Sequence, residues 1–420
     1  MDKFIINGGR PLKGQVKIEG SKNAALPIVF ASLLISQGET TLRNVPPLMD
    51  IYTAKAVLEY LGAKVSYDAD SHVMTVNAEN ITENTAPYEL MRKMRASFLV
   101  LGPILVRTGS AKISLPGGCV LGSRPVDYHI VAFGKMGAKI SEQSGYVLAE
   151  AKQLNGGEVY FDRPSHTGTE NLLYGAVMAK NKTTIINAAC DPEIVDVANF
   201  LNAAGAKISG AGTPYIEVEP VSGLRSLDYS VCGDRLVAGT FMYGAAMTGG
   251  KVELTDFNPH DLTMVNMKLT EMGCKLDLGK NSLTITGPKK LQPVKVTTFP
   301  YPGFPTDLQA SQMAATTVAE GTSYIRETVF NDRFSHTMEL RRLGADITVS
   351  NDEAIINGVS QLDGAKVMAS DIRAGAGLIL ACLAAKGQSE VLRVYHVDRA
   401  YYKIEEKLTA LGADIKRDKE

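Results

Sequence analysis

A six-fold repeat constrains this 420-residue chain more than any other feature. Six segments place Gly-Ala or Gly-Cys after an apolar or small residue, and follow it with Lys or Asp and an aliphatic residue. The glycines are separated by 75, 68, 68, 71 and 68 residues and stand at Gly62, Gly137, Gly205, Gly273, Gly344 and Gly412. Because each glycine ends a helical pattern and precedes a strand pattern, we predict that each adopts the left-handed conformation that closes a helix.

The residues before each glycine predict a repeat of order βαβαββ. A short strand, expected at residues 16–18 in the first repeat, leads into an apolar helix. A second strand, expected at residues 41–45, precedes an amphipathic helix, the glycine and a hairpin. The fold class is therefore α/β, with six repeats arranged as three in each of two lobes. The strand pattern at residues 4–7 lies outside the first repeat.

The repeat count places a domain boundary near residues 231–233. We expect an N-terminal lobe over residues 22–232 and a C-terminal lobe formed by residues 1–21 and 233–420. Polar residues recur in the loops that lead into the helices, where free backbone amides favour anions. The cleft between the lobes is the expected active site.

Composition limits the partners of the chain. It has 44 basic and 45 acidic residues, for a formal charge of −1, which argues against a broad surface for nucleic acid or membrane. An anionic ligand must instead meet a local cluster of bases, and no feature indicates an obligate protein partner. The N-terminus lacks a signal-peptide pattern, and the apolar runs are shorter than the ~20 residues of a membrane span, so we expect a cytoplasmic protein.

The five cysteines are scattered without CxxC spacing, which is typical of reduced thiols. The histidines lack the spacing of known metal motifs, and no phosphate-binding P-loop occurs, so we expect neither a metal nor an organic cofactor. Cys119 differs from the other cysteines because two glycines precede it and Arg124 follows on the same stretch. A lone cysteine is more often a small buried hydrophobe, but exposure beside a positive charge favours a reactive thiol. Cys190, Cys232, Cys274 and Cys382 are predicted to belong to the core.

Four motifs, in register with the repeats, carry a family resemblance. They are Ser-Lys-Asn-Ala-Ala-Leu-Pro at 21–27, Pro-Gly-Gly-Cys at 116–119 with Gly-Ser-Arg-Pro-Val-Asp at 122–127, Phe-Pro-Thr-Asp-Leu-Gln at 304–309, and His-Val-Asp-Arg at 396–399. Together they resemble the UDP-N-acetylglucosamine 1-carboxyvinyltransferases, a family of enolpyruvyl transferases. The resemblance implies a two-domain inside-out α/β barrel. It also implies transfer of the enolpyruvyl group of phosphoenolpyruvate to the 3'-hydroxyl of UDP-N-acetylglucosamine, with release of phosphate through a tetrahedral ketal, as the first committed step of peptidoglycan precursor synthesis.

By the same resemblance, Cys119 is the proton donor, can add covalently to phosphoenolpyruvate and is the thiol that fosfomycin alkylates. Asp307 is the candidate base that faces the 3'-hydroxyl. Lys22, Arg124 and Arg399 resemble the clamp for phosphate and carboxylate, with Arg95 beside them. Guanidinium forks suit this task because they bind planar anions through two hydrogen bonds.

The remaining expected substrate contacts also follow from the resemblance. Asn23 matches the contact to the N-acetyl group, and Val329 matches a backbone contact to the sugar. Asp371 and Arg373 match a charged pair at the enolpyruvyl end. The uracil-binding run is matched by Pro125, Val126, Asp127 and Tyr128. The segment around the diphosphate is matched by Arg163 and Ser165. Two further substrate-binding positions are Thr306 and Arg333.

The chain departs from the family pattern in places that concern the acceptor. The family usually reads Ser-Val-Gly-Ala-Thr-Glu-Asn where residues 165–171 read Ser-His-Thr-Gly-Thr-Glu-Asn, and a Glu is common where Leu236-Val237 stand. His166-Thr167 motivates one alternative, an enolpyruvyl transferase with a different nucleotide acceptor. Val237 motivates another, a nucleotide-sugar-binding regulator without turnover. Taken singly, His166 is typical of a surface loop, and four residues are typical of helix N-caps, namely Asp191, Asp234, Thr306 and Asp371.

Overall fold

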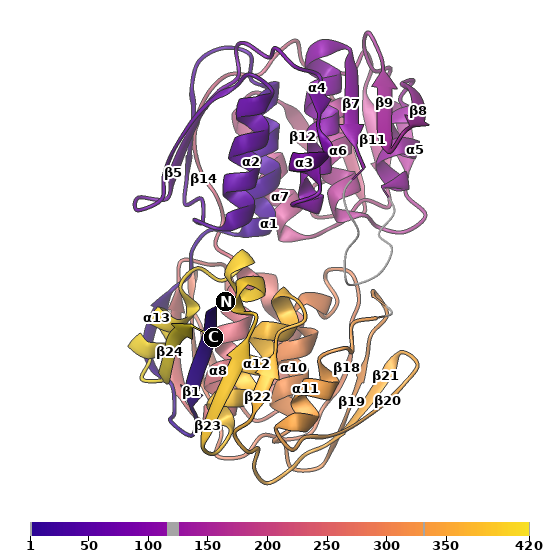
Figure 1. The fold of residues 1–420 in the computed structure, drawn as a ribbon. Helices are drawn as coiled ribbons and strands as arrows, with labels where there is room; N and C mark the ends of the chain where they lie inside the picture. The colour runs from indigo at the N-terminus through magenta and orange to yellow at the C-terminus, as the bar shows by residue number, and fades with distance from the viewer. Residues whose placement is uncertain (1, 116–125, 331, 420) are drawn as a thin grey trace. The chain divides into compact units, whose positions relative to one another are not determined.

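The described residues form six four-stranded sheets, the number of repeats predicted from the sequence (Figure 1). The computed structural model describes residues 2–115, 126–330 and 332–419. In each sheet the first two strands are parallel and the other two continue the sheet in antiparallel pairs. A parallel pair needs a crossover connection, which explains why a helix separates the first two strands of a repeat.

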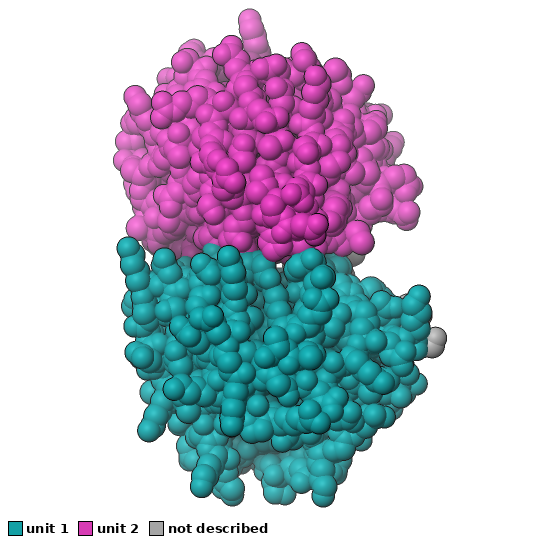
Figure 2. Space-filling model, turned by 90° about the vertical axis from the view of Figure 1, so that its left-hand side faces the viewer, with its two compact units in different colours: residues 1–19, 120–122, 233–420 teal, residues 20–119, 123–232 magenta. Residues whose placement is uncertain are grey.

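The chain forms two units that are coloured separately in Figure 2. Unit 1 combines the first 19 residues with the chain from residue 233 onward, and unit 2 holds most of the residues between them. The chain therefore passes from one unit to the other after residue 19 and returns after residue 232.

Unit 2 holds three of the sheets. In order across each sheet, their strands are β14 (Asp228–Ser230), β3 (Thr40–Arg43), β5 (Val73–Asn77) and β4 (Lys64–Asp68); β6 (Thr85–Ala86), β7 (Ser110–Ser114), β9 (Tyr146–Glu150) and β8 (Lys139–Gln143); and β10 (Gly157–Tyr160), β11 (Thr183–Ile186), β13 (Tyr215–Glu219) and β12 (Lys207–Ser209). The helices are α1 (Lys22–Ala31), η1 (Ser32–Leu34), α2 (Met49–Tyr60), α3 (Tyr88–Met91), η2 (Arg95–Val100), α4 (Leu101–Thr108), α5 (Asp127–Lys135), α6 (His166–Ala176) and α7 (Pro192–Ala203), where η marks a 3₁₀-helix.

Unit 1 holds the other three sheets. Their strands are β2 (Lys13–Lys17), β15 (Lys251–Thr255), β17 (Ser282–Thr286) and β16 (Lys275–Leu278); β18 (Lys295–Thr297), β19 (Thr322–Arg326), β21 (Glu353–Asn357) and β20 (Asp346–Ser350); and β22 (Lys366–Met368), β23 (Gln388–Leu392), β1 (Asp2–Asn7) and β24 (Asp414–Lys419). The helices are α8 (Arg235–Thr248), η3 (Pro259–Leu262), α9 (Thr263–Glu271), η4 (Thr306–Leu308), α10 (Gln309–Thr316), α11 (Thr337–Arg342), α12 (Ile372–Ala384), η5 (Val394–Arg399) and α13 (Ile404–Ala410).

The first helix of each repeat is buried on nearly all sides, whereas the second helix has an exposed face. In unit 1, every residue of α10 is buried, and α10 packs against α8 and α12. In unit 2, α1 buries nine of its ten residues, while α2 exposes part of its surface. Helices therefore fill the inside of each unit and sheets cover it (Figure 1), which confirms the expected α/β fold class of inside-out barrels.

The six repeat glycines close their helices as predicted. Their φ angles range from 92° at Gly137 to 112° at Gly205. At Gly62 the glycine amide donates to the Glu59 carbonyl, and the next amide donates to the Leu58 carbonyl. The same two bonds recur after each of the other five helices, and this pair of bonds defines the Schellman motif. The repeat is thus a recurring helix end that turns the chain into the next strand.

The first and fourth repeats exchange their first strands, which the sequence did not indicate. Strand β2 pairs in parallel with β15 of the fourth repeat, and β14 pairs in parallel with β3 of the first. The assignment of the strand near residues 16–18 to the first repeat is therefore wrong. The reason is connectivity, because each of these strands stays in the unit that the chain is about to leave. In the sixth sheet, β1 lies between β23 and β24 and takes the place of the expected hairpin partner.

The core of unit 1 joins side chains from all parts of its chain, including Phe4, Leu12 and Tyr243. Cys274 and Cys382 are buried as predicted, but Cys190 and Cys232 are only partly buried. Within the described ranges, the helices are all too short or too polar to cross a bilayer.

Candidate active site

The most connected polar cluster predicted from the sequence lies in unit 1, where η4 begins. Thr306 and Asp307 are the first two residues of η4, and Arg333 reaches both of them. Arg333 Nη1 donates to Thr306 Oγ1 at 2.8 Å, and Arg333 Nη2 donates to Asp307 Oδ1 at 2.7 Å. Thr306 was expected to cap the helix, but Pro305 holds the cap position and the Thr306 hydroxyl is used by this cluster instead.

A second guanidinium holds the other oxygen of Asp307. Arg373 Nε donates to Asp307 Oδ2 at 3.1 Å, and Arg373 Nη1 donates to the Tyr401 hydroxyl at 3.0 Å. Burial by itself lowers the pKa of the Arg373 guanidinium, but Tyr401, Asp307 and Asp234 outweigh it, so the pKa is raised overall. The carboxylate of Asp307 is thus fixed by two cations and still 28% exposed.

Glu327, which sequence reasoning missed, organises the loop beside this cluster. It is 1% exposed and accepts hydrogen bonds from the hydroxyls of Thr298 and Thr306, both at 2.8 Å. It also accepts the backbone amide of Val329 at 2.8 Å, and therefore fixes the loop that carries this predicted sugar contact. The repeat offered a signal, because Asn44, Asn187 and Asp256 also stand directly after the second strand of their repeats.

Asp371 and Arg373 do not form an ion pair with each other. The Asp371 carboxylate accepts the backbone amides of Arg373 and Ala374 and caps α12, as predicted for an N-cap. The Arg373 side chain turns to Asp307 instead. Asp234 caps α8 in the same way, through the amides of Leu236 and Val237. Arg399 is the last residue of η5 and is partly buried.

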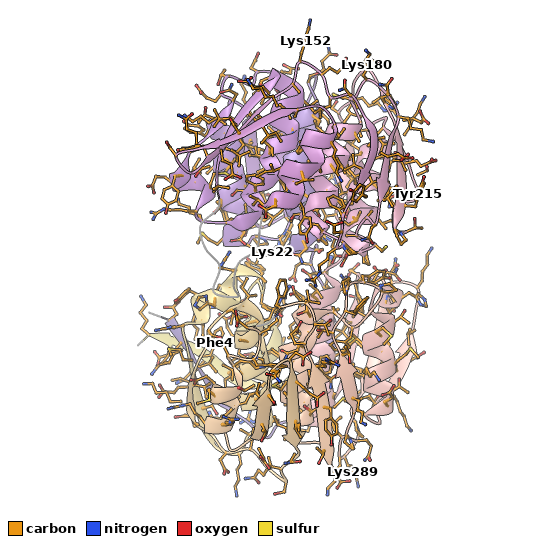
Figure 3. All side chains as sticks on the ribbon, turned by 90° about the vertical axis from the view of Figure 1, so that its right-hand side faces the viewer. Phe4, Lys22, Lys152, Lys180, Tyr215 and Lys289 are labelled. Atoms are coloured by element: carbon orange, nitrogen blue, oxygen red, sulfur yellow. The ribbon has the colours of Figure 1, made fainter. Side chains whose placement is uncertain are left out.

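In unit 2, Lys22 opens α1 and lies at the end of the unit opposite Lys152 and Lys180 (Figure 3). Its ammonium contacts Asp50 of α2 at 2.5 Å, and both side chains are at most 10% exposed. A buried lysine is stabilised by such a carboxylate, which also fixes its position. Asn23 follows in the first turn of α1 and is partly buried.

The nucleotide-side predictions fall around α5 and α6. Val126 is buried, Asp127 is exposed, and the Tyr128 ring stands edge-on to Phe161 with 6.2 Å between centroids. Ser165 caps α6 by accepting the amide of Gly168 at 3.1 Å. Arg163 is exposed just before this cap. The end of α6 is therefore a formed helix N-terminus, which suits an anion.

The variant residues His166 and Thr167 both make side-chain contacts. The Thr167 hydroxyl lies 3.2 Å from His129 Nε2, within a buried network that includes Asn171. His166 begins α6, and its Nδ1 lies 3.3 Å from Glu170 Oε1. The expectation of a plain surface-loop histidine is wrong, because only 30% of the His166 side chain is exposed.

Two acidic residues at the start of α7 complete the surroundings of His166. Its Nε2 lies 4.0 Å from Glu193 Oε2, and Asp191 also faces it. Asp191 holds the N-cap position of α7, but its carboxylate makes no capping hydrogen bond, contrary to our expectation. Burial lowers the pKa of His166, but Glu170, Asp191 and Glu193 outweigh this effect and raise it to about 10.

Three predicted site residues, Cys119, Arg124 and Pro125, lie outside the described residues. Arg95 begins η2, and its side chain also lies outside the described part. The predictions for these four residues therefore stay predictions.

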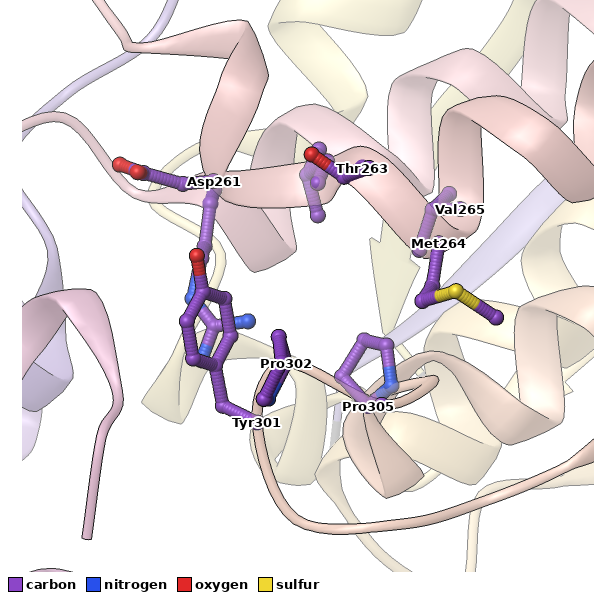
Figure 4. A pocket seen from close by; sticks show the side chains of 10 residues that line it. Asp261, Thr263, Met264, Val265, Tyr301, Pro302 and Pro305 are labelled. Carbon is purple, nitrogen blue, oxygen red and sulfur yellow. The ribbon is translucent and has the colours of Figure 1, made fainter. Parts of the chain in front are cut away.

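A pocket that the sequence did not indicate adjoins Thr306 in unit 1 (Figure 4). Its walls come from the loop with Tyr301, Pro302 and Pro305, and from residues 261–265, where η3 ends and α9 begins. The Arg235 guanidinium lies 5.3 Å from the centroid of the Tyr301 ring. The loop 301–305 thus connects this pocket directly to the Asp307 cluster.

The sequence profile described as EPSP synthase (3-phosphoshikimate 1-carboxyvinyltransferase) matches residues 6–408. Proteins named UDP-N-acetylglucosamine 1-carboxyvinyltransferase from Desulfosudis oleivorans and Thermodesulfovibrio yellowstonii are each 48% identical, over at least 99% of both chains. A protein named UDP-N-acetylglucosamine 1-carboxyvinyltransferase 1 from Caldanaerobacter subterraneus is 50% identical over 99% of both chains.

Solved structures agree on the fold. The enolpyruvyl transferase NikO from Streptomyces tendae superposes with a TM-score of 0.89 at 24% identity, over 99% of this chain and 98% of that chain. EPSP synthase from Acinetobacter baumannii superposes with a TM-score of 0.78 at 19% identity over the whole of both chains. At these identities the likeness concerns the fold, whereas the curated relatives are alike in sequence from end to end. The chain belongs to the UDP-N-acetylglucosamine 1-carboxyvinyltransferase family of enolpyruvyl transferases.

Proposed function

We propose that this protein transfers the enolpyruvyl group of phosphoenolpyruvate to the 3'-hydroxyl of UDP-N-acetylglucosamine and releases phosphate. The observation that carries the proposal is the identity to the curated carboxyvinyltransferases along the whole chain. The reaction is the first committed step of peptidoglycan precursor synthesis. We also propose a cytoplasmic location, as the sequence led us to expect.

The proposed chemistry needs a base for the sugar hydroxyl and an acid for the methylene carbon of phosphoenolpyruvate. Asp307 is the proposed base. Its two guanidinium partners orient the carboxylate, and its remaining exposure lets a hydroxyl approach. The sugar oxygen attacks the central carbon while the methylene carbon takes a proton from Cys119, which gives the tetrahedral ketal. The Cys119 thiolate then takes a proton back from the methyl group, and departure of phosphate restores the double bond.

Charge is the second requirement, because phosphoenolpyruvate brings a phosphate and a carboxylate. We propose that Lys22, Arg124 and Arg399 bind these groups, with Arg95 beside them. The fixed contact between Lys22 and Asp50 supports this role, because a prepositioned cation stabilises developing charge without reorganising. Arg333 and Arg373 hold the base, and Asp371 holds the N-terminus of the helix that carries Arg373.

For the acceptor, we propose that residues 125–128 bind uracil, that Arg163 and Ser165 lie near the diphosphate, and that Asn23 binds the N-acetyl group. The formed cap at Ser165 supports the diphosphate assignment. Thr306 precedes Asp307 and shares the Arg333 guanidinium with it, and Glu327 links Thr306 to the amide of Val329, so we propose that the sugar presents its 3'-hydroxyl here. Residues of both units thus contribute to the proposed reaction, in the lobes expected at residues 22–232 and at 1–21 with 233–420.

Phosphate release tests the proposal directly. Purified protein mixed with phosphoenolpyruvate and UDP-N-acetylglucosamine should liberate phosphate, and Cys119→Ala should lose most of this activity. Cys190→Ala is the matched control, because Cys190 is a partly buried thiol outside the proposed machinery. Fosfomycin should inactivate the wild-type protein and the control.

The two alternatives give different results in the same assay. A transferase with another acceptor would release phosphate with a different UDP-sugar or nucleoside but not with UDP-N-acetylglucosamine. A regulator without turnover would gain thermal stability from the nucleotide sugar and release no phosphate. Either outcome would refute the proposed function.

A further inference from the structure

We propose that His166, Asp191 and Glu193 form a binding site for one divalent cation of the Zn²⁺ type in unit 2. One ligand atom from each residue lies within 4.8 Å of the others. Within the described part of the chain, this is the group of His, Cys, Asp and Glu side chains that meets the geometry of a three-ligand metal site. The proposal does not depend on the proposed reaction, because it concerns binding alone.

The site is built by two packed helices, not by a sequence motif. His166 is the first residue of α6, and Asp191 and Glu193 lie at the start of α7, which packs against α6. The intervening strand β11 returns the chain to the same end of the unit. This explains why residues separated by about 25 positions meet, and why spacing rules led us to expect no metal.

The orientation of the imidazole is the first argument for a ligand. Glu170 lies one turn along α6 from His166, and its Oε1 is 3.3 Å from His166 Nδ1. With Nδ1 facing Glu170, the other ring nitrogen, Nε2, faces Glu193 Oε2 at 4.0 Å. A carboxylate behind one ring nitrogen is the usual setting of a metal-binding histidine, because the carboxylate fixes the tautomer and the ring; here the other nitrogen faces the two remaining ligands.

The burial of Glu170 adds to this argument. Its side chain is 1% exposed, and its Oε1 has His166 Nδ1 as a neighbour at 3.3 Å without a formed hydrogen bond. A buried carboxylate oxygen without a hydrogen bond is costly. Metal binding at Nε2 would leave the proton of the imidazole on Nδ1, where it would point at this oxygen.

The donor set selects the kind of cation. One imidazole and two carboxylates are ligands that Zn²⁺ accepts, and three protein ligands leave a fourth position open. Ligand atoms about 2.0–2.2 Å from Zn²⁺ lie roughly 3.5 Å apart in a tetrahedron. The present atoms would therefore move inward by about 1 Å or less, which side-chain rotation can supply.

Calorimetric titration with ZnCl₂ tests the proposal. Tag-free protein is stripped with a chelator and carries Cys119→Ser, so that the candidate reactive thiol does not compete for the metal. We expect one Zn²⁺ per chain and at least ~100-fold weaker binding in His166→Val, which introduces the residue that the family usually carries. Glu170→Gln should weaken binding by about 10–100-fold, as loss of a carboxylate behind a histidine ligand does.

His260→Ala is the matched control, because His260 is an exposed histidine that also has an aspartate beside it. It should bind Zn²⁺ like the parent protein. Unchanged thermal unfolding of His166→Val would show that loss of binding is not loss of folding. Absence of saturable binding by the parent below about 1 mM, or equal affinity in His166→Val and His260→Ala, would overturn the proposal. In a crystal soaked in Zn²⁺, the anomalous peak should lie between His166 and Glu193, and a peak elsewhere would also overturn it.

Discussion

Arg333→Lys tests whether the Asp307 cluster needs a guanidinium fork or only a positive charge. Arg333 is 5% exposed and gives one hydrogen bond to Thr306 and another to Asp307. Lysine keeps the charge, but its single ammonium does not span two acceptors in the planar geometry of the fork. We therefore expect the loss of one of the two bonds, and a carboxylate that is less well fixed.

The magnitude follows from the lost bond. A hydrogen bond to a charged group contributes about 1.5–3 kcal/mol, and each 1.36 kcal/mol of barrier corresponds to about a factor of ten in rate. If Asp307 is the base, the kcat/KM for UDP-N-acetylglucosamine should fall by roughly 10- to 150-fold. The loss should appear mainly in kcat, because the fork positions the reacting group and does not itself bind the nucleotide in the proposed scheme.

Arg326→Lys is the matched control in the same unit. Arg326 donates to Asp352 at 2.7 Å, and its side chain is 56% exposed, so its guanidinium pairs with a carboxylate at the surface and not with Asp307. Exposed ion pairs contribute little, so this variant should match the wild type in rate and unfolding. Steady-state phosphate release and denaturant unfolding measure both. Equal rates for Arg333→Lys and wild type would refute the positioning role, and equal losses in both variants would show that the effect is not specific to the cluster.

Two further predictions concern unit 2. Gly205→Ala should destabilise the unit by about 1–2 kcal/mol through its left-handed backbone alone, because the added methyl would meet no atom within 4 Å. Gly62→Ala should lower the free energy of unfolding by about 1–3 kcal/mol more than Gly205→Ala does, because its methyl would lie 2.6 Å from the Asn80 carbonyl oxygen. Equal unfolding midpoints for the two variants would contradict this prediction. The pKa of His166 is raised to about 10, so its contribution to stability is complete below about pH 6.5 and is lost as pH rises toward 10. Unfolding measured with a chelator present should show this decline in the wild type, and the same decline in His166→Val would contradict it.

Much of the fold was predictable because each repeat ends in a local backbone motif that requires a particular residue. A glycine with a positive φ after an amphipathic helix is a requirement of the Schellman motif, so six such glycines at near-constant spacing indicated six equivalent helix ends. The exchange of β2 and β14 was not predictable in this way. Either strand satisfies the same pairing pattern, and only the path of the chain between units decides which sheet receives it.

In the candidate site, too, some features were predictable from the sequence and others were not. Residue types and motifs pointed to Thr306, Asp307, Arg333 and Arg373, but not to their partners. The family resemblance implied that Asp371 and Arg373 act as a charged pair, yet the Asp371 carboxylate is used by the helix cap. The guanidinium is then directed across the unit to Asp307. Sequence neighbours at a helix N-terminus point in different directions, so proximity in sequence is a poor guide to ion pairs there.

Asp191 and His166 illustrate the opposite case, in which an expected structural role is not fulfilled. An aspartate before Pro-Glu at a helix start is typical of a cap, but the Asp191 carboxylate makes no capping bond and instead faces His166. Glu170 and Glu193 converge on the same imidazole from two helices. Three carboxylates around one half-buried histidine favour a bound cation, whether a proton or a metal. The two experiments on His166 test these forms one at a time, because the protonated ring gives a stability decline toward pH 10 in chelator, and the metal site gives stoichiometric Zn²⁺ binding after the chelator is removed.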